Sequence, residues 1–457
     1  MKLSVIILAA GHGKRMYSDL PKVLHPLAGK SLLERVVTTA NQLNPHAIYI
    51  VYSDNLTSYL TQLNHWPVQW VKQDKQLGTG HAVLQALPQI PDDHQILVLY
   101  GDVPLITVPT IQSLLNQIDK NGVGLLTAIL ENPQGFGRII RASQHVMSII
   151  EDKDANEQQR QIKEINTGVM TAPANRLKTW LPALKNHNAQ QEYYLTDIIT
   201  MAVKEKLAVK GIMVEQVEEV QGINTPAELI RLERYYQTYQ AQQLLAQGVI
   251  IRDPARFDLR GEIVCGRDVI IDVNVMLEGR IMIGNHCVIE PNVILRNVTV
   301  GDNVTIKANC VIEDSVIEAD CQIGPFARLR PGTYLSSHVQ VGNFIEIKNS
   351  KLGEYAKAHH LGYLGDAVIG RYVNVGAGTI TCNYDGACKH TTTIGDYSFI
   401  GSGTELVAPV TVGEHAYIGA GSTITQDVPS HQLTLARARQ VTIKNWQPPV
   451  KNNNKKK

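Results

Sequence analysis

A six-residue repeat dominates the second half of the chain and restricts its fold more than any other feature of the sequence. Apolar residues, or a small or polar substitute, return at every sixth position, with one-residue slips between runs. The repeated positions are Cys265, Ile271, Leu277, Ile283, Ile289 and Leu295; Val300, Ile306 and Ile312; Ile317, Ile323, Leu329, Leu335, Val341 and Ile347; Ile369, Val375 and Thr381; and Ile394, Ile400, Leu406, Val412, Ile418 and Ile424. A fixed hexad is typical of a parallel β-helix, because each short strand contributes one inward side chain at every turn.

The first half, to about residue 225, alternates short β-rich runs with longer segments that are compatible with helices. The clearest runs are residues 5–8, 48–51 and 96–100. This alternation predicts an α/β domain with a mostly parallel sheet. In such sheets ligands bind beyond the carboxyl ends of the strands, and Gly11 and Asp102 each follow a predicted strand.

A helix is predicted to join the two halves. Thr225 has the properties of an N-cap, Pro226 suits the first helical position, and Glu228 completes a capping box. A helix of about 22 residues would be roughly 33 Å long, enough to hold two domains apart. We therefore expect a first domain over residues 1–226, a helical linker over 227–247 and a second domain over 248–457.

Composition excludes several classes of protein. The 457 residues include 43 Lys and Arg against 42 Asp and Glu, so no global charge field indicates nucleic acid or an anionic membrane as a partner. No apolar run approaches the roughly 18 residues that span a bilayer, and the first 16 residues lack the layout of a signal peptide. The six cysteines form no CxxC pair, which favours reduced thiols over a metal site. We expect a cytoplasmic protein.

A glycine-rich turn follows the first predicted strand, between Leu8 and Met16. Its backbone N–H groups can approach a phosphate closely. The turn lacks the third glycine of a dinucleotide fingerprint and the Gly-Lys-Ser/Thr of a P-loop. With Arg15, Met16, Pro21 and Lys22, the segment instead resembles the opening pattern of the sugar-1-phosphate nucleotidyltransferases.

Further residues of that family pattern follow in order and strengthen the resemblance. They are Gln73, Gly78, Thr79, Tyr100, Gly101, Asp102, Gly137, Glu151, Asn166 and Asn224. Joining a sugar phosphate to a nucleoside triphosphate brings two anions together, which demands cations and positioning more than a protein nucleophile. We expect Arg15 and Lys22 to neutralise phosphate charge, and Asp102 and Asn224 to supply oxygen ligands for Mg²⁺.

The resemblance implies a Rossmann-like nucleotidyltransferase domain with defined contacts. It places the nucleotide against Leu8, Ala9, Ala10 and Gly11, with Gly78 and Thr79 at the base or ribose. It places the amino sugar against Gly137, Glu151 and Asn166. Taken one at a time, these residues also have ordinary explanations, as surface cations, turn residues or solvent-facing amides.

A second candidate site lies among the hexads, at Arg330, Lys348, His360, Tyr363, Asn374, Asn383 and Tyr384. An imidazole is suited to taking a proton from a sugar amine as that amine attacks an acetyl thioester, so His360 is the predicted base. Arg330 and Lys348 are expected to hold the sugar phosphate, and Tyr363 to position it. Residues 382–389 interrupt the hexads, and such insertions usually emerge as loops on a binding face. There Asn383 would orient His360, unless His360 is an ordinary surface histidine.

From about residue 3 to 450 the chain resembles the bacterial family of bifunctional uridylyltransferases and N-acetyltransferases. The resemblance implies synthesis of UDP-N-acetylglucosamine, for peptidoglycan and lipopolysaccharide, from glucosamine-1-phosphate, acetyl-coenzyme A and UTP with Mg²⁺. It also implies a left-handed β-helix and a homotrimer that completes the acetyl site between subunits. The groove for acetyl-coenzyme A would be lined by Ala377, Asn383, Tyr384, Ser402, Ala420 and Arg437. Two departures are His12, where Lys is common, and His359, a rival base beside His360.

Three other interpretations stay open. One is a single-activity nucleotidyltransferase whose β-helix serves only assembly or regulation, and another is a β-helix that acts as a non-catalytic trimeric scaffold. The third is a metal-dependent hydratase, which needs separated histidines that converge on one metal. It ranks last because His359 and His360 are adjacent and are expected to point to opposite sides of a strand.

Overall fold

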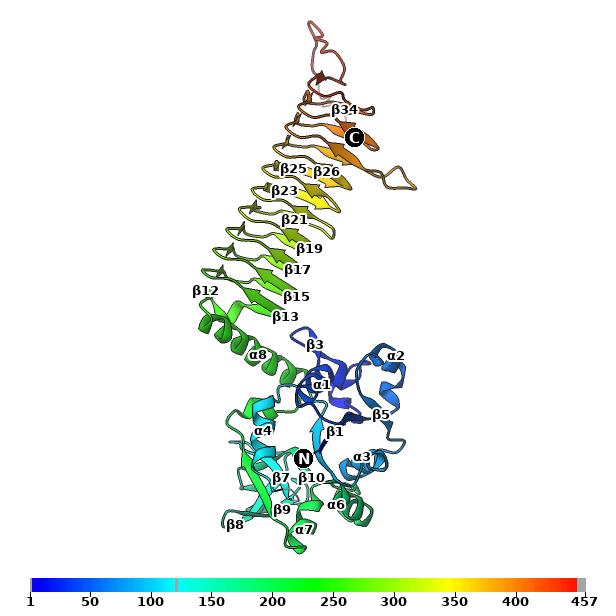
Figure 1. Cartoon of the computed structure of the whole chain (residues 1–457), viewed down its shortest axis with the longest axis vertical. Coiled ribbons are helices and arrows are strands. Elements are labelled where there is room, and N and C mark those ends of the chain that lie inside the picture. Colours follow the sequence, from blue (N-terminus) through cyan, green and yellow to red (C-terminus); the bar gives the residue numbers. More distant parts are fainter. Residues whose placement is uncertain (1, 120–121, 450–457) are drawn as a thin grey trace, which may run out of the picture. The chain divides into compact units, whose positions relative to one another are not determined.

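The computed structural model describes residues 2–119 and 122–449, and the chain divides into two compact units, Met1–Gln240 and Ala241–Lys457. The division falls within helix α8 (Pro226–Ala246), the segment predicted as the linker. Figure 1 shows the α/β elements of the first unit and the stacked coils of the second. In the part of the chain that is described, no helix is both long enough and apolar enough to cross a membrane.

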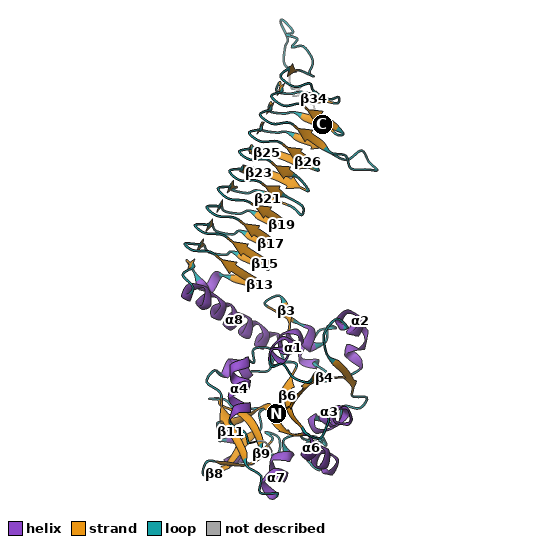
Figure 2. Ribbon diagram, in the orientation of Figure 1, coloured by secondary structure: helices purple, strands orange, loops and turns teal. Residues whose placement is uncertain are grey.

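A mixed β-sheet forms the centre of the first unit (Figure 2). Its order is β11-β7-β10-β6-β1-β4-β5, with a β8-β9 hairpin attached to β10. The strands are β1 (Lys2–Leu8), β4 (Ala47–Tyr52), β5 (Gln69–Lys72), β6 (His94–Tyr100), β7 (Val123–Ile129), β8 (Arg138–Ala142), β9 (His145–Ile150), β10 (Glu164–Pro173) and β11 (Val209–Met213); β2 (Pro26–Leu27) and β3 (Lys30–Ser31) form a separate ribbon. The three strands predicted from the sequence lie in β1, β4 and β6, which pair in parallel as expected. Only β10 runs against its neighbours β6 and β7 in this row.

Helices cover both faces of this sheet. The α-helices of this unit that precede α8 are α1 (Leu32–Gln42), α2 (Leu60–Leu63), α3 (Thr79–Ala86), α4 (Val108–Asn116), α5 (Glu157–Arg160), α6 (Ala174–Trp180) and α7 (Asp197–Lys204), and all but α2 and α5 contribute buried side chains. Successive side chains of a strand point to opposite faces. Accordingly, Ile6 of β1 joins the buried cluster that includes Leu177 and Ile198, while Ile7 joins the cluster that includes Val36 and Ile111. A strand buried on both faces explains the continuous apolar run at the start of the chain.

The predicted capping box at the start of α8 is confirmed. The Glu228 backbone N–H donates to Thr225 Oγ1 at 3.3 Å, and Glu228 Oε2 accepts from the Thr225 backbone N–H at 2.9 Å. The same oxygen also accepts from the backbone N–H of Asn224 at 2.7 Å. The cap therefore fixes the backbone of a predicted metal ligand as well as the beginning of the helix.

The second unit is a left-handed parallel β-helix, as predicted. Its strands run from β12 (Ile250–Ile251) to β35 (Leu433–Thr434) and form a 24-stranded sheet. The longest are β13 (Asp258–Cys265), β15 (Met276–Ile283), β17 (Ile294–Val300), β19 (Val311–Ile317), β23 (Gln340–Lys348) and β25 (Lys357–Gly365). Every pairing between these named strands is parallel, because each coil places its strand above the equivalent strand of the coil before it.

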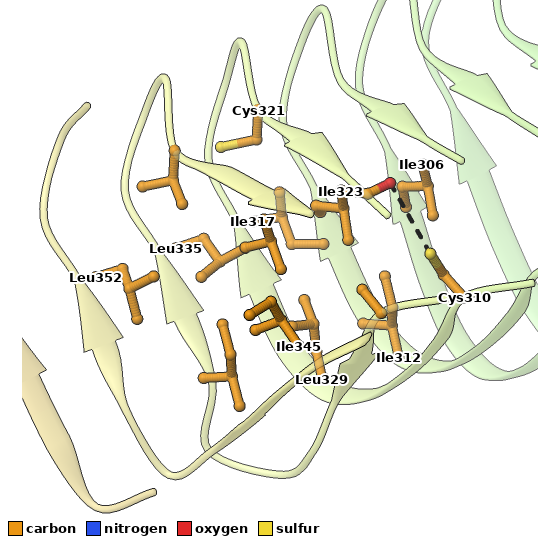
Figure 3. Close-up of a cluster of buried hydrophobic side chains, with 14 of the residues drawn as sticks. Ile306, Cys310, Ile312, Ile317, Cys321, Ile323, Leu329, Leu335, Ile345 and Leu352 are labelled. Atoms are coloured by element: carbon orange, nitrogen blue, oxygen red, sulfur yellow. Dashed lines mark hydrogen bonds between the residues drawn. The ribbon is translucent and has the colours of Figure 1, made fainter. Parts of the chain in front are cut away.

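The hexad positions form the core of the β-helix (Figure 3). Every predicted position is buried except Cys265, which is partly buried. The interval between Ile347 and Ile369, where no repeat was recognised, is filled by Leu352, Ala358 and Leu364, all fully buried. Two slips in the repeat and the small side chain of Ala358 concealed this stretch. All six cysteines are free.

Asn and Asp occupy many corners of the coils in the left-handed backbone region. Asn297, Asp314, Asn349 and Asp366 all have φ between 41° and 51°. Short polar side chains tolerate this conformation better than most residues. Because the corners lie one above another, the side chains hydrogen-bond from coil to coil, as where Asn297 Nδ2 donates to Asp314 Oδ1 at 3.0 Å.

Candidate active sites

A cavity of about 510 Å³ opens at the carboxyl ends of β1 and β6, where the sequence predicted a ligand site. It is lined by Leu8, Ala9, Ala10, Gly11, His12, Lys22, Val23, Gln73, Gln76, Gly78, Thr79, Ala82, Tyr100, Asp102 and Glu192. The predicted nucleotide contacts from Leu8 to Gly11 therefore share one cavity with Gln73, Gly78 and Thr79. Gln73 Nε2 donates to the Gly78 carbonyl at 3.3 Å, which ties this wall together.

A cation bridges the two predicted metal ligands. The Lys22 ammonium contacts Asp102 Oδ2 and donates to Asn224 Oδ1 at 3.0 Å. The backbone N–H of Ile223 donates to the Asp102 carbonyl at 2.9 Å, which joins the loops that carry the two ligands. A carboxylate and an amide oxygen that already share one cation are a fitting donor pair for Mg²⁺, which takes oxygen ligands and keeps several waters.

Tyr100 connects this cavity to the residues predicted to bind the amino sugar. Burial raises the pKa of the Tyr100 hydroxyl, and the nearby Glu151 carboxylate adds to the shift. Glu151 Oε1 accepts from the Thr196 hydroxyl at 2.9 Å, and the Asn166 backbone N–H donates to the Gly137 carbonyl at 2.8 Å. A Cβ on Gly137 would lie 3.4 Å from both Glu151 carboxylate oxygens. Gly137, Glu151 and Asn166 are thus neighbours, although none lines the cavity described above.

Several other residues of the first unit depart from the sequence prediction. Arg15 is exposed in the short helical turn Lys14–Met16 and does not line the cavity. Val23, Gln76, Ala82 and Glu192 line it but were not predicted. Gln76 Nε2 donates to the Ala10 carbonyl, so it orders the glycine-rich turn, and its nearness to Gln73 was an available signal. Glu192 comes from a distant loop, and no sequence pattern marks it.

In the β-helix, the hydrogen-bond partner of His360 is Asn343 and not Asn383. The two residues are opposite each other in the register of β23 and β25, and His360 Nδ1 lies 3.2 Å from Asn343 Oδ1. Asn383 Nδ2 donates instead to Asp366 Oδ2. The prediction was wrong because the strand register places Asn383 above Asp366, whereas Asn343 is the residue in register with His360.

The orientation predicted for His359 was also wrong. The two histidine rings meet edge to face with centroids 5.9 Å apart, and do not point to opposite sides of a strand. Leu361, with φ of 42°, makes a corner directly after them and interrupts the normal alternation of side chains. His359 Nε2 lies 3.0 Å from Gln340 Oε1, and burial lowers the pKa of His359, with His360 adding to the effect.

Three cationic side chains of the second unit, Arg330, Lys348 and Lys389, lie close to one another. The neighbouring ammonium of Lys389 lowers the pKa of Lys348, and the guanidinium of Arg330 contributes to the same shift. Arg330 Nη1 also donates to Glu346 Oε1 at 2.8 Å. Lys389 was not predicted. It belongs to the inserted loop, where its backbone forms an antiparallel β-bridge with that of Tyr384. Like charges held this close favour an anionic ligand such as a phosphate.

Four of the residues predicted to line the acetyl-coenzyme A groove, Ala377, Ser402, Ala420 and Arg437, fall in a column on successive coils. The Gly403 N–H donates to the Ala377 carbonyl at 2.7 Å, and the Gly421 N–H donates to the Ser402 carbonyl at 2.8 Å. Arg437 Nη1 donates to the Ala420 carbonyl at 2.6 Å. The N–H of Gly378, next to Ala377, lies 3.4 Å from the His360 carbonyl, so the column begins beside the predicted base.

The other predicted residues of this site flank the same coils. Tyr363 pairs with Glu346 and Ile380 in the strand register, and Asn374 pairs with Lys357. The Tyr384 hydroxyl donates to the Gly386 carbonyl at 2.6 Å within the inserted loop. The loop leaves the β-helix between Cys382 and Thr392, as an interruption of the hexads predicted (Figure 1).

Comparison with protein families matches both units. Residues 5–168 match the MobA-like NTP transferase domain. Residues 391–426 match the bacterial transferase hexapeptide, as six repeats, and residues 259–356 match the GMPPB C-terminal domain.

Comparison with individual proteins gives matches along almost the whole chain. A bifunctional protein GlmU of Legionella pneumophila (strain Lens) is 56% identical in an alignment 457 positions long that covers 99% of each chain. The bifunctional protein GlmU of Marinobacter nauticus is 52% identical over 450 residues, 98% of this chain and 99% of that one. Among solved structures, a nucleotidyl transferase from Methanothermobacter thermautotroptrophicus is 19% identical, with a TM-score of 0.37, over 51% of this chain and 97% of that chain.

Proposed function

The chain belongs to the family of bifunctional GlmU proteins, and from that premise we propose which residues perform each of its two reactions. It is a bifunctional enzyme, with a nucleotidyltransferase in the first unit and a hexapeptide acetyltransferase in the second. The acetyltransferase transfers acetyl from acetyl-coenzyme A to glucosamine-1-phosphate, and the nucleotidyltransferase transfers UMP from UTP to the acetylated product.

In the first unit, the phosphate oxygen of N-acetylglucosamine-1-phosphate attacks the α-phosphorus of UTP, and pyrophosphate leaves. The strongest support is the cavity in which the glycine-rich turn, Lys22 and Asp102 come together. We assign the turn to the triphosphate, Gln73, Gly78 and Thr79 to the nucleoside, and Gly137, Glu151 and Asn166 to the amino sugar. Positioning and charge neutralisation supply the catalysis, because no protein nucleophile is required.

We assign Mg²⁺ to the oxygens of Asp102 and Asn224, which the Lys22 ammonium bridges. When bound, the ion would neutralise negative charge on the triphosphate. Lys22 would then be released to contact a phosphate oxygen itself. Arg15 is close in sequence to this loop, and we assign it to the outgoing pyrophosphate.

In the second unit, His360 takes a proton from the sugar amine as its nitrogen attacks the acetyl carbonyl, and the coenzyme A thiolate leaves. Asn343 orients the imidazole, and Arg330, Lys348 and Lys389 hold the sugar phosphate. We assign Tyr363 and Asn374 to the sugar. Acetyl-coenzyme A would lie along Ala377, Asn383, Tyr384, Ser402, Ala420 and Arg437.

We propose that the enzyme acts as a homotrimer in the cytoplasm, where UTP and acetyl-coenzyme A are made. His360 is exposed on this single chain. A base used for acyl transfer needs walls that exclude water. A second copy packed against this face would supply them, and flat β-helix faces suit a closed, threefold assembly.

The test is to incubate the protein with glucosamine-1-phosphate, acetyl-coenzyme A, UTP and Mg²⁺ and to identify the products by mass spectrometry. We expect free coenzyme A, pyrophosphate and UDP-N-acetylglucosamine. Asp102→Ala should abolish uridylyl transfer and spare acetylation, while His360→Ala should do the reverse. Uridylyl transfer only when pre-acetylated sugar phosphate is supplied would contradict the proposal and reduce the β-helix to a scaffold.

A further inference from the structure

Asp366 holds the side chain of Asn383 at a corner of the β-helix. The Asp366 carboxylate accepts from Asn349 Nδ2 at 2.6 Å through Oδ1, and from Asn383 Nδ2 through Oδ2. Asn349 and Asp366 are equivalent corners of two successive coils, and the strand register places Asn383 above Asp366 on the next coil. The carboxylate therefore lies between two amides. Asn383 is only 7% exposed, which leaves its side chain little freedom to move.

This arrangement determines which atom Asn383 presents to the site. An ionised carboxylate can only accept hydrogen bonds, so the amide of Asn383 must turn its NH₂ group toward Asp366. Its Oδ1 then faces away from Asp366. Within residues 2–119 and 122–449, no protein donor is found for that oxygen, which is therefore available as an acceptor for a ligand.

Asp366 differs from the other acidic corners in its surroundings. Asp314 also accepts from the asparagine of the preceding coil, Asn297, at 3.0 Å, but the next corner is Gly332, which has no side chain to hold. Asp366 lies near the ammonium groups of Lys348 and Lys389, and its partner Asn383 stands at the start of the inserted loop. Of these two aspartates, only Asp366 accepts a hydrogen bond from a residue that is predicted to belong to the acetyl-transfer site, Asn383.

We propose that Asp366 is a positioning residue for acetyl transfer, which fixes the Asn383 amide so that Oδ1 accepts a hydrogen bond from an amide N–H of the pantetheine arm of acetyl-coenzyme A. The inference rests on the acetyl transfer proposed above. If the Asn383 amide were flipped, its NH₂ group would face the N–H of the pantetheine arm, and two donors cannot form a hydrogen bond. If the Asn383 amide were not held by Asp366, it would have to be ordered each time acetyl-coenzyme A binds. Asp366 does not touch the substrate and acts only through Asn383.

The first test replaces Asp366 with Gly, the residue that occupies the equivalent corner at position 332. Glycine suits the positive φ, so the change removes the carboxylate without straining the corner. We expect the KM for acetyl-coenzyme A to rise about tenfold, as for loss of one ordered hydrogen bond, while the KM for glucosamine-1-phosphate does not rise. Asp314→Gly is the matched control, and it should leave both KM values unchanged.

A second variant tests whether the hydrogen bond to Asn383 matters apart from the negative charge at position 366. In the double variant Asn349→Asp with Asp366→Asn, the new carboxylate at 349 accepts from the new amide at 366. The amide oxygen at 366 must then face Asn383, which restores the original orientation. We expect the KM of this variant for acetyl-coenzyme A to lie within about twofold to threefold of that of the unmodified enzyme. That difference is smaller than the rise in KM expected when the hydrogen bond is lost.

The outcomes distinguish this inference from the function on which it rests. If the unmodified enzyme releases no thiol from acetyl-coenzyme A, the proposed acetyl transfer itself is wrong. If thiol release is normal but Asp366→Gly behaves like Asp314→Gly, Asp366 is merely a structural corner. If the double variant binds acetyl-coenzyme A as poorly as Asp366→Gly, the orientation of Asn383 is not what Asp366 controls.

Discussion

His360 Nδ1 and Asn343 Oδ1 lie 3.2 Å apart on adjacent coils of the β-helix, in direct register. When Nδ1 carries the ring proton and donates it to this oxygen, Nε2 keeps its lone pair. That is the tautomer required of a base. His359, by contrast, has its Nε2 against Gln340, so the two neighbouring histidines are held by different nitrogens.

Asn343→Leu should therefore lower kcat for acetyl transfer about tenfold, because the imidazole loses the acceptor that fixes its tautomer. Asn343→Asp keeps an acceptor and should retain most of the activity. The measurement is thiol release from acetyl-coenzyme A at saturating substrates. Gln340→Leu is the matched control, since it removes the hydrogen-bond partner of His359 as Asn343→Leu removes that of His360. A larger loss of kcat in Gln340→Leu than in Asn343→Leu would identify His359 as the base.

Lys22→Met should strengthen the binding of a divalent cation to the nucleotide-free enzyme. The ammonium of Lys22 occupies the position between Asp102 and Asn224, and a second cation cannot enter until it moves. We expect at least a severalfold lower Kd for Mn²⁺, measured from the electron paramagnetic resonance signal of the free ion. Lys14→Met is the control for general loss of positive charge. An unchanged Kd in Lys22→Met would show that the lysine does not compete for the metal ligands.

Most of the β-helix, and part of the sites, followed from the sequence for physical reasons. The inward hexads could be predicted because burial repeats with the coil, although Leu352, Ala358 and Leu364 escaped notice. Asn343 and Lys389 could not be predicted, because their nearness to His360 and Lys348 depends on which residues stack between coils. The error over His359 has the same origin, since a corner at Leu361 replaces the alternation of a regular strand.

The KM for N-acetylglucosamine-1-phosphate should rise as the pH falls, because Glu151 becomes protonated. Burial raises the pKa of this carboxyl, while the hydroxyl of Thr196 lowers it. Glu151 therefore gains its proton at a higher pH than an ordinary glutamate does, and once protonated it no longer accepts hydrogen bonds as an ionised carboxylate. Thr196→Val removes the stabilising hydroxyl and should move the acid limb of the KM profile to higher pH.

Glu151→Gln, which has no titrating carboxyl, should flatten that limb. The profile is measured as initial uridylyl-transfer rates over a range of sugar phosphate concentrations at each pH. A limb that persists unchanged in Glu151→Gln, or that moves to lower pH in Thr196→Val, would assign it to another group.

Ile317→Ala should destabilise the β-helix much more than Val316→Ala, although the two residues are adjacent in β19. Ile317 is a hexad residue with no exposed surface (Figure 3), whereas the side chain of Val316 is 39% exposed on the outer face. Truncating a buried isoleucine costs about 2–5 kcal/mol, because it removes buried apolar surface and leaves a cavity. The exposed valine has little packing to lose, and surface changes usually stay within about 0.5 kcal/mol. Urea unfolding followed by circular dichroism compares the two variants, and equal losses of stability would mean that the inward repeat is not what holds the coils together.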